Sequence, residues 1–370
     1  MDLNNVFAEN LKRIRTGKGL TQGELGDAIG YSNKAVSKWE SGGGIPGVEI
    51  LLRLSRVLEV DLNTLIRTEE PVYYLGIDGG GTKTALALAD TNGKVLRITK
   101  APGCNPVDIG MDRSQTILRS AIDEILGQIP RSSVSLYAGI AGGTTGDHQQ
   151  QFAEFFRSLG FHQAQNHNDA QNAIAAGLRG REGVLAILGT GSIVYAVTGE
   201  TRHRIGGYGY LFGDAGSGYN IGNLGIQAAF AATDGSGPDT LLKAKIDSYA
   251  GAEYPVNVAF FYRGGKRCIA ACAPLVMEAC MEGDAVVSRI LTSAMAAFAP
   301  QLTAAAHRVA EKDPIVLAGG LMRRAELLLP ILKKQLPEEI GERITVCRED
   351  PAIGALLLAG APIEEGEHIC

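Results

Sequence analysis

A strand, a glycine turn and a second strand occur in that order twice, and this pattern constrains the fold most. The first copy is "VYYLGIDGGGTKTALALAD" (72–90), and the second is "VLAILGTGSIVYAV" (184–197). Each reads as a β-hairpin, and strand-like and helix-like segments alternate from residue 72 onward, which is typical of an α/β domain. Two such hairpins predict two similar halves that face one cleft.

The first 67 residues carry a helical pattern instead. Phe7, Leu11 and Ile14 recur at helical spacing, and Thr21 precedes Glu24 by three residues, as in a capping box. The run Glu69-Glu70-Pro71 ends this pattern. The sequence predicts an all-α domain over residues 1–67, a linker over 68–72, and α/β domains over 73–187 and 188–362. We expect the last helix to be able to return to the first α/β domain.

The composition favours an ordinary globular protein. The net charge of −5 is too mild to indicate a polyanion as partner of the whole chain. We find no apolar run of membrane-spanning length and no signal peptide at the start, so we expect a cytoplasmic protein without membrane contact. The six cysteines lack CxxC or zinc spacing and are expected to be reduced thiols.

Residues 21–42, "TQGELGDAIGYSNKAVSKWESG", predict two helices around a turn at Gly30. The second helix offers short polar and basic side chains, which can reach base edges in a major groove. These are Ser32, Asn33, Lys34, Ser37 and Lys38. Basic residues outnumber acidic ones over residues 11–38, where Lys12, Arg13, Arg15, Lys18, Lys34 and Lys38 stand against Glu24 and Asp27. Because this basic patch is small, we expect the module to bind DNA as a dimer or weakly.

Residues 5–67 resemble lambda-repressor/Cro-type helix-turn-helix domains. The stretch "LTQGELGDAIGYSNKAVSKWESG" carries most of the resemblance, and "VEILLRLSRVLEVDLNTLI" matches the closing helices. The resemblance implies that Gln22 contacts phosphate and that Ser32, Asn33, Lys34 and Ser37 read bases of double-stranded DNA, with Lys38 on the same face. The alternative is a small helical bundle that docks a protein.

The loop in "GIDGGGTKT" (76–84) fits neither common nucleotide motif. A Walker A loop needs GxxxxGK[ST], and a dinucleotide turn needs GxGxxG at the start of a helix. The turn is almost all backbone, so its N–H groups could wrap a phosphate, with Thr82 adding a hydroxyl and Lys83 a counter-charge. Asp78 could hold Mg²⁺ through waters. Taken alone, the stretch could equally be a plain glycine turn.

Other stretches repeat or complement this loop. "LGTGS" (188–192) is a second glycine turn, and "PIVLAGGLM" (314–322) is a strand that ends in Gly319 and Gly320, suited to backbone contact with a base or ribose. Asp169 comes before an Ala-rich helix. A carboxylate at a helix start is favoured as the anion, which suits a general base.

Residues 73–362 resemble the sugar kinase/Hsp70/actin superfamily, and within it the N-acetylglucosamine kinase and BadF/BadG-type ATPase family. The matching stretches, in order, are "GIDGGGTKT", "AGIAG" (138–142), "NDA" (168–170), "GTGS" (189–192), "GGYGYLFGDAGSG" (206–218), "LAGGL" (317–321) and "PAIGALLLA" (351–359). The resemblance implies an α/β fold of two ribonuclease-H-like, actin-type ATPase domains around a cleft, preceded by the small all-α domain.

The resemblance also implies roles for single residues. The phosphates of ATP would lie against Gly79, Gly80, Gly81, Thr82, Lys83, Thr84, Gly189, Thr190, Gly191 and Ser192, and adenosine against Gly319 and Gly320. Asp169 would deprotonate the sugar hydroxyl, while Asn105, Asp169, Thr190 and Asp214 would bind the sugar. The implied activity is an ATP- and Mg²⁺-dependent kinase of N-acetylglucosamine or a related amino sugar, joined to a DNA-binding module in a homodimer.

Two departures leave alternatives open. Ile193 follows "GTGS" where the family usually has a polar residue, and Ala215 replaces the glutamate of "GDEGS". One alternative is a transcriptional regulator that senses sugar or nucleotide without significant turnover. Another is the iron–sulfur branch of the family, but Cys268, Cys272 and Cys280 lie in "RCIAACAPLVMEAC" (267–280), which reads as one apolar core helix.

Overall fold

The computed structural model describes residues 3–66 and 72–364. Most of the expected linker at 68–72 lies outside these residues. The contacts divide the chain into two compact units, Met1–Val72 and Tyr73–Cys370, and each has cores of its own.

The first unit confirms the expected all-α fold. Its helices are α1 (Leu3–Gly17), α2 (Gln22–Ile29), α3 (Asn33–Glu40), α4 (Val48–Leu58) and α5 (Leu62–Ile66). Both hydrogen bonds of the capping box between Thr21 and Glu24 are present. Gly30 ends α2 in the left-handed region, with φ of 77°, where glycine carries no steric penalty. The turn between α2 and α3 therefore depends on this glycine.

A buried charge network fixes the start of α2 against α1 and α3. Arg15 donates two hydrogen bonds to Glu40, at 2.5 and 3.0 Å, and Gln22 donates to the same carboxylate at 2.8 Å. The Arg15 and Glu40 side chains are 9% and 3% exposed. Burial acts to raise the pKa of Glu40, but the hydrogen bonds from Arg15 and Gln22 outweigh it and lower that pKa. Glu40 is thus held as the anion that both neighbours require.

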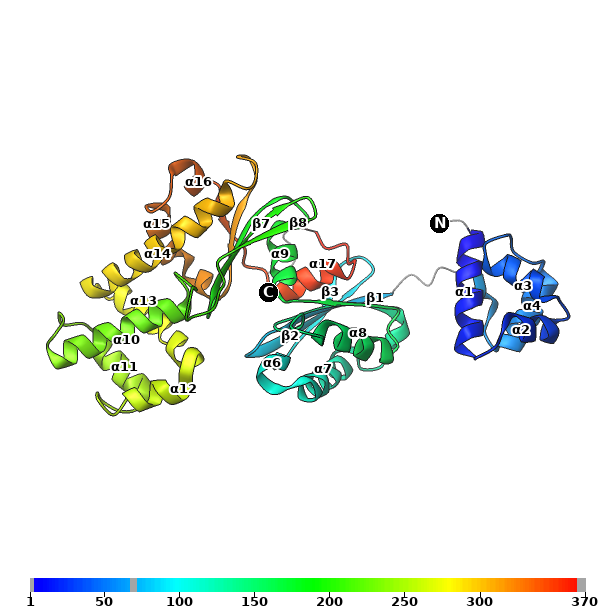
Figure 1. Ribbon diagram of the computed structural model, residues 1–370, viewed down its shortest axis with the longest axis horizontal. Helices are drawn as coiled ribbons and strands as arrows, with labels where there is room; N and C mark the ends of the chain where they lie inside the picture. Colours follow the sequence, from blue (N-terminus) through cyan, green and yellow to red (C-terminus); the bar gives the residue numbers. More distant parts are fainter. Residues whose placement is uncertain (1–2, 67–71, 365–370) are drawn as a thin grey trace. The chain divides into compact units, whose positions relative to one another are not determined.

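The second unit contains two five-stranded sheets of the same topology (Figure 1). The strands of the first, in the order β3-β2-β1-β4-β5, are β3 (Val95–Pro102), β2 (Lys83–Asp90), β1 (Tyr73–Gly79), β4 (Val134–Ile140) and β5 (Gln163–His167). Those of the second, in the order β8-β7-β6-β9-β10, are β8 (Thr201–Ile205), β7 (Ser192–Thr198), β6 (Gly183–Leu188), β9 (Ile315–Ala318) and β10 (Ile344–Val346).

In each sheet the first three strands pair antiparallel and the last two add in parallel. This repeated order confirms the predicted pair of ribonuclease-H-like halves. β6 pairs with β9 and β7, whereas the expected boundary between residues 187 and 188 falls inside that strand. We therefore place the boundary before Gly183.

Helices cover both faces of each sheet (Figure 1). Those between the strands of the first half are α6 (Pro106–Ile109), α7 (Met111–Leu126) and α8 (His148–Ser158), and α9 (Ala170–Leu178) leads to the second half. The second half adds α10 (Gly218–Asp234), α11 (Leu242–Ala250), α12 (Val258–Ala270), α13 (Ala273–Met281), α14 (Ala285–Ala306), α15 (Ala325–Lys333), α16 (Glu338–Glu342) and α17 (Pro351–Leu358). Short 3-10 turns lie at Arg131–Ser133 and Gly320–Arg324.

Residue size along β2 determines how closely helices approach the first sheet. Leu86 and Leu88 point into the core beneath α7 and α8. The alternate residues Ala85, Ala87 and Ala89 face α17. Because side chains alternate across a strand, large residues fill one face and alanines leave room on the other. α17 therefore packs tightly on the first sheet although it comes last in the chain.

α9 and α17 cross in close contact, and glycines make the crossing possible. A Cβ on Gly354 of α17 would lie 1.9 Å from the carbonyl oxygen of Asn172 in α9. A Cβ on Gly76 of β1 would lie 2.5 Å from the carbonyl oxygen of Ala352. Since neither atom belongs to a movable side chain, no side chain fits at these two positions.

One expectation about the second half needs correction. Residues 267–280 are not one helix, because the chain breaks between α12 and α13 around Ala271 and Cys272. α14 is long and apolar enough to cross a membrane by length and composition alone, but Leu291, Phe298 and Leu302 pack in the core of the second half. We therefore take α14 to be a core helix.

We expect Gly354→Ala to lower the free energy of unfolding of the second unit by about 2 kcal/mol or more, because the crossing must open to admit a methyl group. Calorimetry or urea unfolding followed by circular dichroism measures this. Gly341→Ala in α16 of the same unit is the matched control, since its Cβ would meet nothing closer than 3.7 Å. Equal stability of Gly354→Ala and the parent chain would contradict the tight crossing.

Candidate functional site

The turn between β1 and β2 is held by neighbouring backbone. Gly80 N–H donates to the carbonyl of Lys83 at 2.9 Å, and the Gly80 carbonyl accepts from Cys104 N–H at 3.0 Å. A Cβ on Gly79 would lie 2.6 Å from Cys104 Sγ. Gly81, Thr82 and Lys83 are exposed at the tip. The loop thus presents a fixed backbone with one hydroxyl and one cation to solvent.

Two of the residues expected to contact phosphate have hydroxyls that serve the fold. Thr84 is fully buried, and its hydroxyl donates to the carbonyl of Pro102 at 2.8 Å. Ser192 is 3% exposed, and its hydroxyl donates to the carbonyl of Ala215 at 2.7 Å. Both hydroxyls thus stabilise the hairpins through hydrogen bonds to neighbouring backbone. Phosphate contact through these two hydroxyls stays a prediction.

The second hairpin turn is fixed by the start of α10. The carbonyls of Gly189 and Thr190 accept from the N–H groups of Gly218 and Tyr219, at 2.8 and 3.1 Å. A Cβ on Gly191 would lie 2.8 Å from Asp214 Oδ2. The structure therefore brings Thr190 and Asp214, two of the expected sugar ligands, to one loop cluster.

A cavity of about 790 Å³ joins the first hairpin to the second sheet. From the first half it is lined by Asp78, Lys83, Ala173 and Ala176, from the second by Ile187, Ala318, Gly319, Gly320, Met322, Arg323 and Glu326, and from the final segment by Cys347, Arg348, Glu349, Asp350 and Pro351. Its volume lies in the range of small-ligand sites. No residue of the second hairpin turn, 189–191, lines the cavity, so a single cleft faced by both turns stays a prediction.

Gly319 and Gly320 have different roles at this cavity. Gly319 has φ of 100°, and a Cβ there would lie 2.4 Å from the carbonyl oxygen of Leu188. Only glycine lets β9 end so close to the end of β6. A Cβ on Gly320 would meet nothing within 4 Å, so its backbone faces open space. A flat group in the cavity could approach this backbone closely.

Asp78 at the end of β1 is the most perturbed carboxylate of the cavity. Burial raises its pKa to about 7, and the negative charges of Asp169 and Asp350 add to the rise, while a hydrogen bond from Asn172 and the charge of Lys83 oppose it. Asn172 Nδ2 lies 2.9 Å from Asp78 Oδ1. The same amide donates to the carbonyls of Ile77 and Gly139. Asn172 therefore fixes Asp78 to both central strands of the first sheet.

Asp169 stands directly before α9, as the sequence suggested. Burial raises the pKa of Asp169, and hydrogen bonds from the backbone N–H groups of Asp169 and Ala170 only partly oppose the rise. The expectation that the helix start would favour the anion was therefore incomplete, because desolvation is the larger effect. A base with a raised pKa accepts a proton more strongly.

Two buried polar atoms beside Asp169 have no hydrogen-bond partner within the described residues. They are Nδ1 of His167 and Oδ1 of Asn168. Buried polar atoms are nearly always satisfied in folded proteins. Orphan atoms next to a perturbed carboxylate are therefore a sign of a site that a polar ligand completes.

Asn105 lies in the first half, away from the second hairpin turn. Its side chain caps α6 by accepting from Val107 N–H at 3.0 Å and donates to Asp108 at 2.9 Å. Over residues 3–66 and 72–364, no hydrogen bond or ion pair joins Asn105 or Asp214 to Asp169. None of Asn105, Asp169, Thr190 and Asp214 lines the 790 Å³ cavity. A common sugar site for these four residues therefore stays a prediction.

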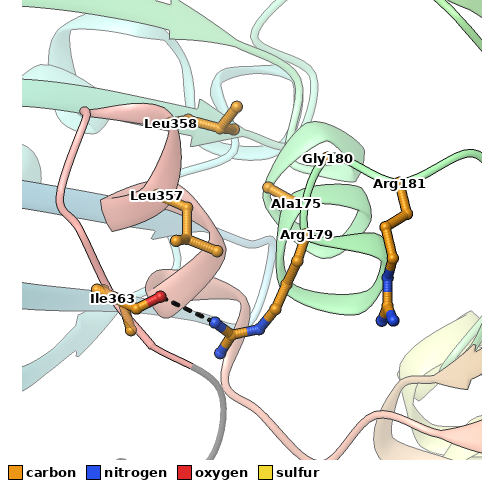
Figure 2. Close-up of a pocket in the computed structure, with 7 residues that line it drawn as sticks. All are labelled: Ala175, Arg179, Gly180, Arg181, Leu357, Leu358 and Ile363. Atoms are coloured by element: carbon orange, nitrogen blue, oxygen red, sulfur yellow. Dashed lines mark hydrogen bonds between the residues drawn. The ribbon is translucent and has the colours of Figure 1, made fainter.

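A second cavity, of about 660 Å³, uses other positions of α9 and α17 (Figure 2). Arg179 donates to the carbonyl of Ile363 at 3.1 Å, the bond drawn in Figure 2, and pairs with Glu349. Its lining contains none of the residues predicted for ATP or sugar. Arg179 thus serves to tie the chain after α17 to the end of α9.

The predicted DNA-reading residues of α3 share one face. Ser32, Asn33, Lys34, Ser37 and Lys38 are exposed, and Val36 and Trp39 on the opposite side are buried in the core. The hydroxyl of Ser32 also caps α3 by accepting from Ala35 N–H. Gln22 is half-buried and bonded to Glu40, so its predicted phosphate contact would have to add to that bond.

Several residues of the main cavity escaped the sequence analysis. Asn172, Arg323, Arg348 and Asp350 all lie at or beside it. Arg323 stands three residues after Gly320. Its closeness to the predicted adenosine-binding glycines could have marked it as a candidate cavity residue. Asn172 could not, because an asparagine within an Ala-rich helix carries no motif, and its role arises only where α9 meets β1 and β4.

The pH dependence of stability tests the environment of Asp78. A carboxyl whose folded pKa is raised to about 7 stabilises the fold below its unfolded pKa, and this contribution is lost as pH rises toward 7. We expect the unfolding free energy of Asp78→Asn relative to the parent chain, without ligand, to grow by about 2 kcal/mol from pH 5 to 8. Urea unfolding at several pH values measures it, with the exposed Asp112→Asn as control. A pH-independent difference would contradict the assignment.

Comparisons with known proteins agree with this geometry. The model of the BadF/BadG/BcrA/BcrD ATPase family matches residues 75–359, and a helix-turn-helix model matches residues 11–65. The N-acetylmuramic acid/N-acetylglucosamine kinase of Clostridium acetobutylicum is 33% identical over 304 residues, which cover 78% of this chain and 98% of that protein.

The crystal structure of a candidate N-acetylglucosamine kinase from Chromobacterium violaceum superimposes with a TM-score of 0.65 at 26% identity, covering 79% of this chain and all of that one. At the N-terminus, the HTH-type transcriptional activator BcrR of Enterococcus faecalis is 44% identical over 64 residues, 17% of this chain and 31% of that protein. The chain therefore belongs to the BadF/BadG/BcrA/BcrD ATPase family and carries a helix-turn-helix domain at its N-terminus.

Proposed function

We propose that the protein is an ATP-dependent kinase of N-acetylglucosamine or a related amino sugar, joined to a sequence-specific DNA-binding module. One observation carries the proposal. The main cavity brings Asp78 and Lys83 of the first glycine hairpin to Gly319 and Gly320 of the second sheet. Kinase relatives that span the same part of the chain support this reading.

The cavity fits ATP by size and by chemistry. Gly320 leaves open backbone for a base or ribose. Lys83, Arg323 and Arg348 are exposed cations at its lining, and cations are what a triphosphate requires. No group of three His, Cys, Asp or Glu side chains that could hold a metal occurs within the described residues. Asp78 would therefore hold Mg²⁺ largely through waters and the phosphates, as Mg²⁺ prefers.

Phosphoryl transfer here would depend mainly on positioning and charge. Mg²⁺ would neutralise charge on the phosphates. Asp169 would take the proton of the sugar hydroxyl as that oxygen bonds to the γ-phosphorus and ADP leaves. Its raised pKa favours this transfer once the carboxyl is ionised. Asn172 would act as a positioning residue, since it holds Asp78 in place.

The sugar would bind between the loop cluster of Thr190 and Asp214 and the segment that carries Asn105 and Asp169. We infer an amino sugar because a kinase relative that this chain matches over 98% of that protein's length is named for N-acetylmuramic acid and N-acetylglucosamine. The site lacks the polar group after "GTGS" and the glutamate of "GDEGS", so the exact sugar is set by other residues.

With ATP and DNA as ligands, we place the protein in the cytoplasm.

The first unit would bind double-stranded DNA through α3. Its exposed face of Asn33, Lys34, Ser37 and Lys38 has the donors and acceptors that the major groove requires. Operators for such domains are commonly two-fold symmetric, and we propose a homodimer on that ground. Regulation by sugar or nucleotide without turnover remains the alternative, and the turnover measurement below distinguishes the two.

We expect the purified chain to release ADP from ATP-Mg²⁺ in the presence of N-acetylglucosamine or a related amino sugar. Asp169→Asn should lower kcat by at least about 100-fold while sugar and ATP still bind, because only the proton acceptor is lost. A coupled ADP assay and calorimetric titration measure the two properties.

Asp112→Asn, which changes an exposed carboxylate of α7, is the matched control and should keep most of the activity. If no sugar in a complete panel of amino sugars causes ADP release, the kinase proposal is wrong. Sugar-dependent DNA affinity in such an inactive protein would favour the sensing alternative.

We expect Asn33→Ala and Lys34→Ala to weaken binding to a DNA site selected from a random pool by about 1–3 kcal/mol each, because base contacts are lost. Fluorescence anisotropy at fixed salt measures this. The fluorescence of Trp39, the single tryptophan of the chain, checks that the unit remains folded. Lys94→Ala in the second unit is the control, and a chain without residues 1–67 that still binds DNA would contradict the assignment.

A further inference from the structure

Lys266 of α12 pairs with Asp214, although no motif marked this lysine. Its Nζ lies 3.0 Å from Asp214 Oδ2. The Asp214 side chain is only 4% exposed and that of Lys266 is 32% exposed. A buried carboxylate needs a partner, and here the partner reaches it from a separate helix 52 residues further along the chain.

The backbone of α12 is distorted directly before this lysine. Gly265 has φ of 56° and ψ of −153° inside the helix, a region that is essentially restricted to glycine. The helix therefore kinks at the residue that precedes Lys266. A regular helix would not need a glycine at this position. The backbone at Gly265 therefore constrains the direction in which the Lys266 side chain leaves the helix.

A second contact orders the lysine. Lys266 Nζ lies 5.5 Å from the ring centroid of Tyr210, within the range of a cation–π interaction. Tyr210 in turn packs on Tyr219 of α10, with ring centroids 5.0 Å apart. The ammonium is thus held between a carboxylate and an aromatic ring, beside the loop cluster of Thr190 and Asp214.

We propose that Lys266 is a specificity-determining residue of the sugar site, which selects amino sugars with an acylated nitrogen over sugars with a free ammonium. The inference rests on the proposed function, in which Asp214 binds the sugar. An unpaired Asp214 would attract a cationic sugar. Lys266 cancels that attraction and adds a positive charge that repels a second ammonium.

An N-acetyl group has no charge and meets no such repulsion. Its amide can still use the hydrogen-bonding capacity of Asp214 that Lys266 does not occupy. Ala215 fits the same picture, because the family's glutamate at this position would bring a further negative charge that favours a cation. The loop of this chain therefore carries one acid fewer than the family pattern, and Lys266 of α12 places a positive charge against Asp214.

The test compares kcat/KM for N-acetylglucosamine and for glucosamine. The parent chain should prefer N-acetylglucosamine. In Lys266→Gln the ratio of the two values should fall about tenfold or more, because the charge of Asp214 is no longer compensated. Lys266→Arg keeps the charge and should keep the ratio. A purely structural role would lower both values together and leave the ratio unchanged.

Lys245→Gln is the matched control, since Lys245 of α11 pairs with Glu278 of α13 and with Glu282 directly after that helix and not with Asp214. It should leave the ratio as in the parent chain. An unchanged ratio in an active Lys266→Gln chain would overturn the inference alone. A parent chain that phosphorylates no sugar of the amino-sugar panel would instead overturn the proposed function.

Discussion

The close crossing of α9 and α17 is the constraint on which the rest of the second unit depends. Gly354 and Gly76 allow the backbones of α17, α9 and β1 to approach within distances that exclude a side chain. The carboxylates of the cleft are positioned by the same elements. Asp169 precedes α9, Asp350 caps the start of α17, and Asp78 lies one residue before the end of β1. Because packing fixes these elements against one another, it also holds Asp169 and Asp350 close enough to Asp78 to contribute to its raised pKa. A change in the crossing would therefore change the chemistry of the site as well as the stability of the fold.

The electrostatics of the cleft follow from this arrangement. Desolvation and the neighbouring carboxylates raise the pKa of Asp78 to about 7, and burial raises the pKa of Asp169 as well. Such a set of acids is unfavourable in the empty protein. A nucleotide with its metal ion would bring the positive charge of the ion to Asp78, while Lys83 and Arg323 would meet the phosphates. Asn172 holds Asp78 in place meanwhile, since its amide also satisfies two strand carbonyls. The site is thus preorganised for a ligand that carries both negative phosphates and a positive metal ion.

The sequence predicted the fold well because its signals were local. Alternating strand residues, glycine turns and helix caps each predict the local structure from a few neighbouring residues. The two hairpins then predict one repeated topology. The interactions that cross the chain were not accessible in this way. The pairing of Asp214 with Lys266 depends on a kink at Gly265, and the break between α12 and α13 interrupts a run that is apolar throughout. Thr84 and Ser192 match their motifs, yet their hydroxyls bond to Pro102 and Ala215. A motif identifies which residues belong to a site, but packing decides which of their atoms are available.

The two hairpins have the same topology but carry different charges, so the two halves of the repeated fold are not equivalent. The two turns differ in the residues that flank them: Asp78 stands one residue before the end of β1, whereas the second turn follows Leu188, the last residue of β6. The first residue after the turn is Lys83 in one copy and Ser192 in the other. The first half therefore supplies the charges of the cavity from its hairpin. The second half supplies an apolar strand end, together with the glycines 319 and 320. A symmetric pair of loops could hold a phosphate in either orientation. This difference in charge would orient a nucleotide with its phosphates toward the first hairpin and its base toward the second sheet.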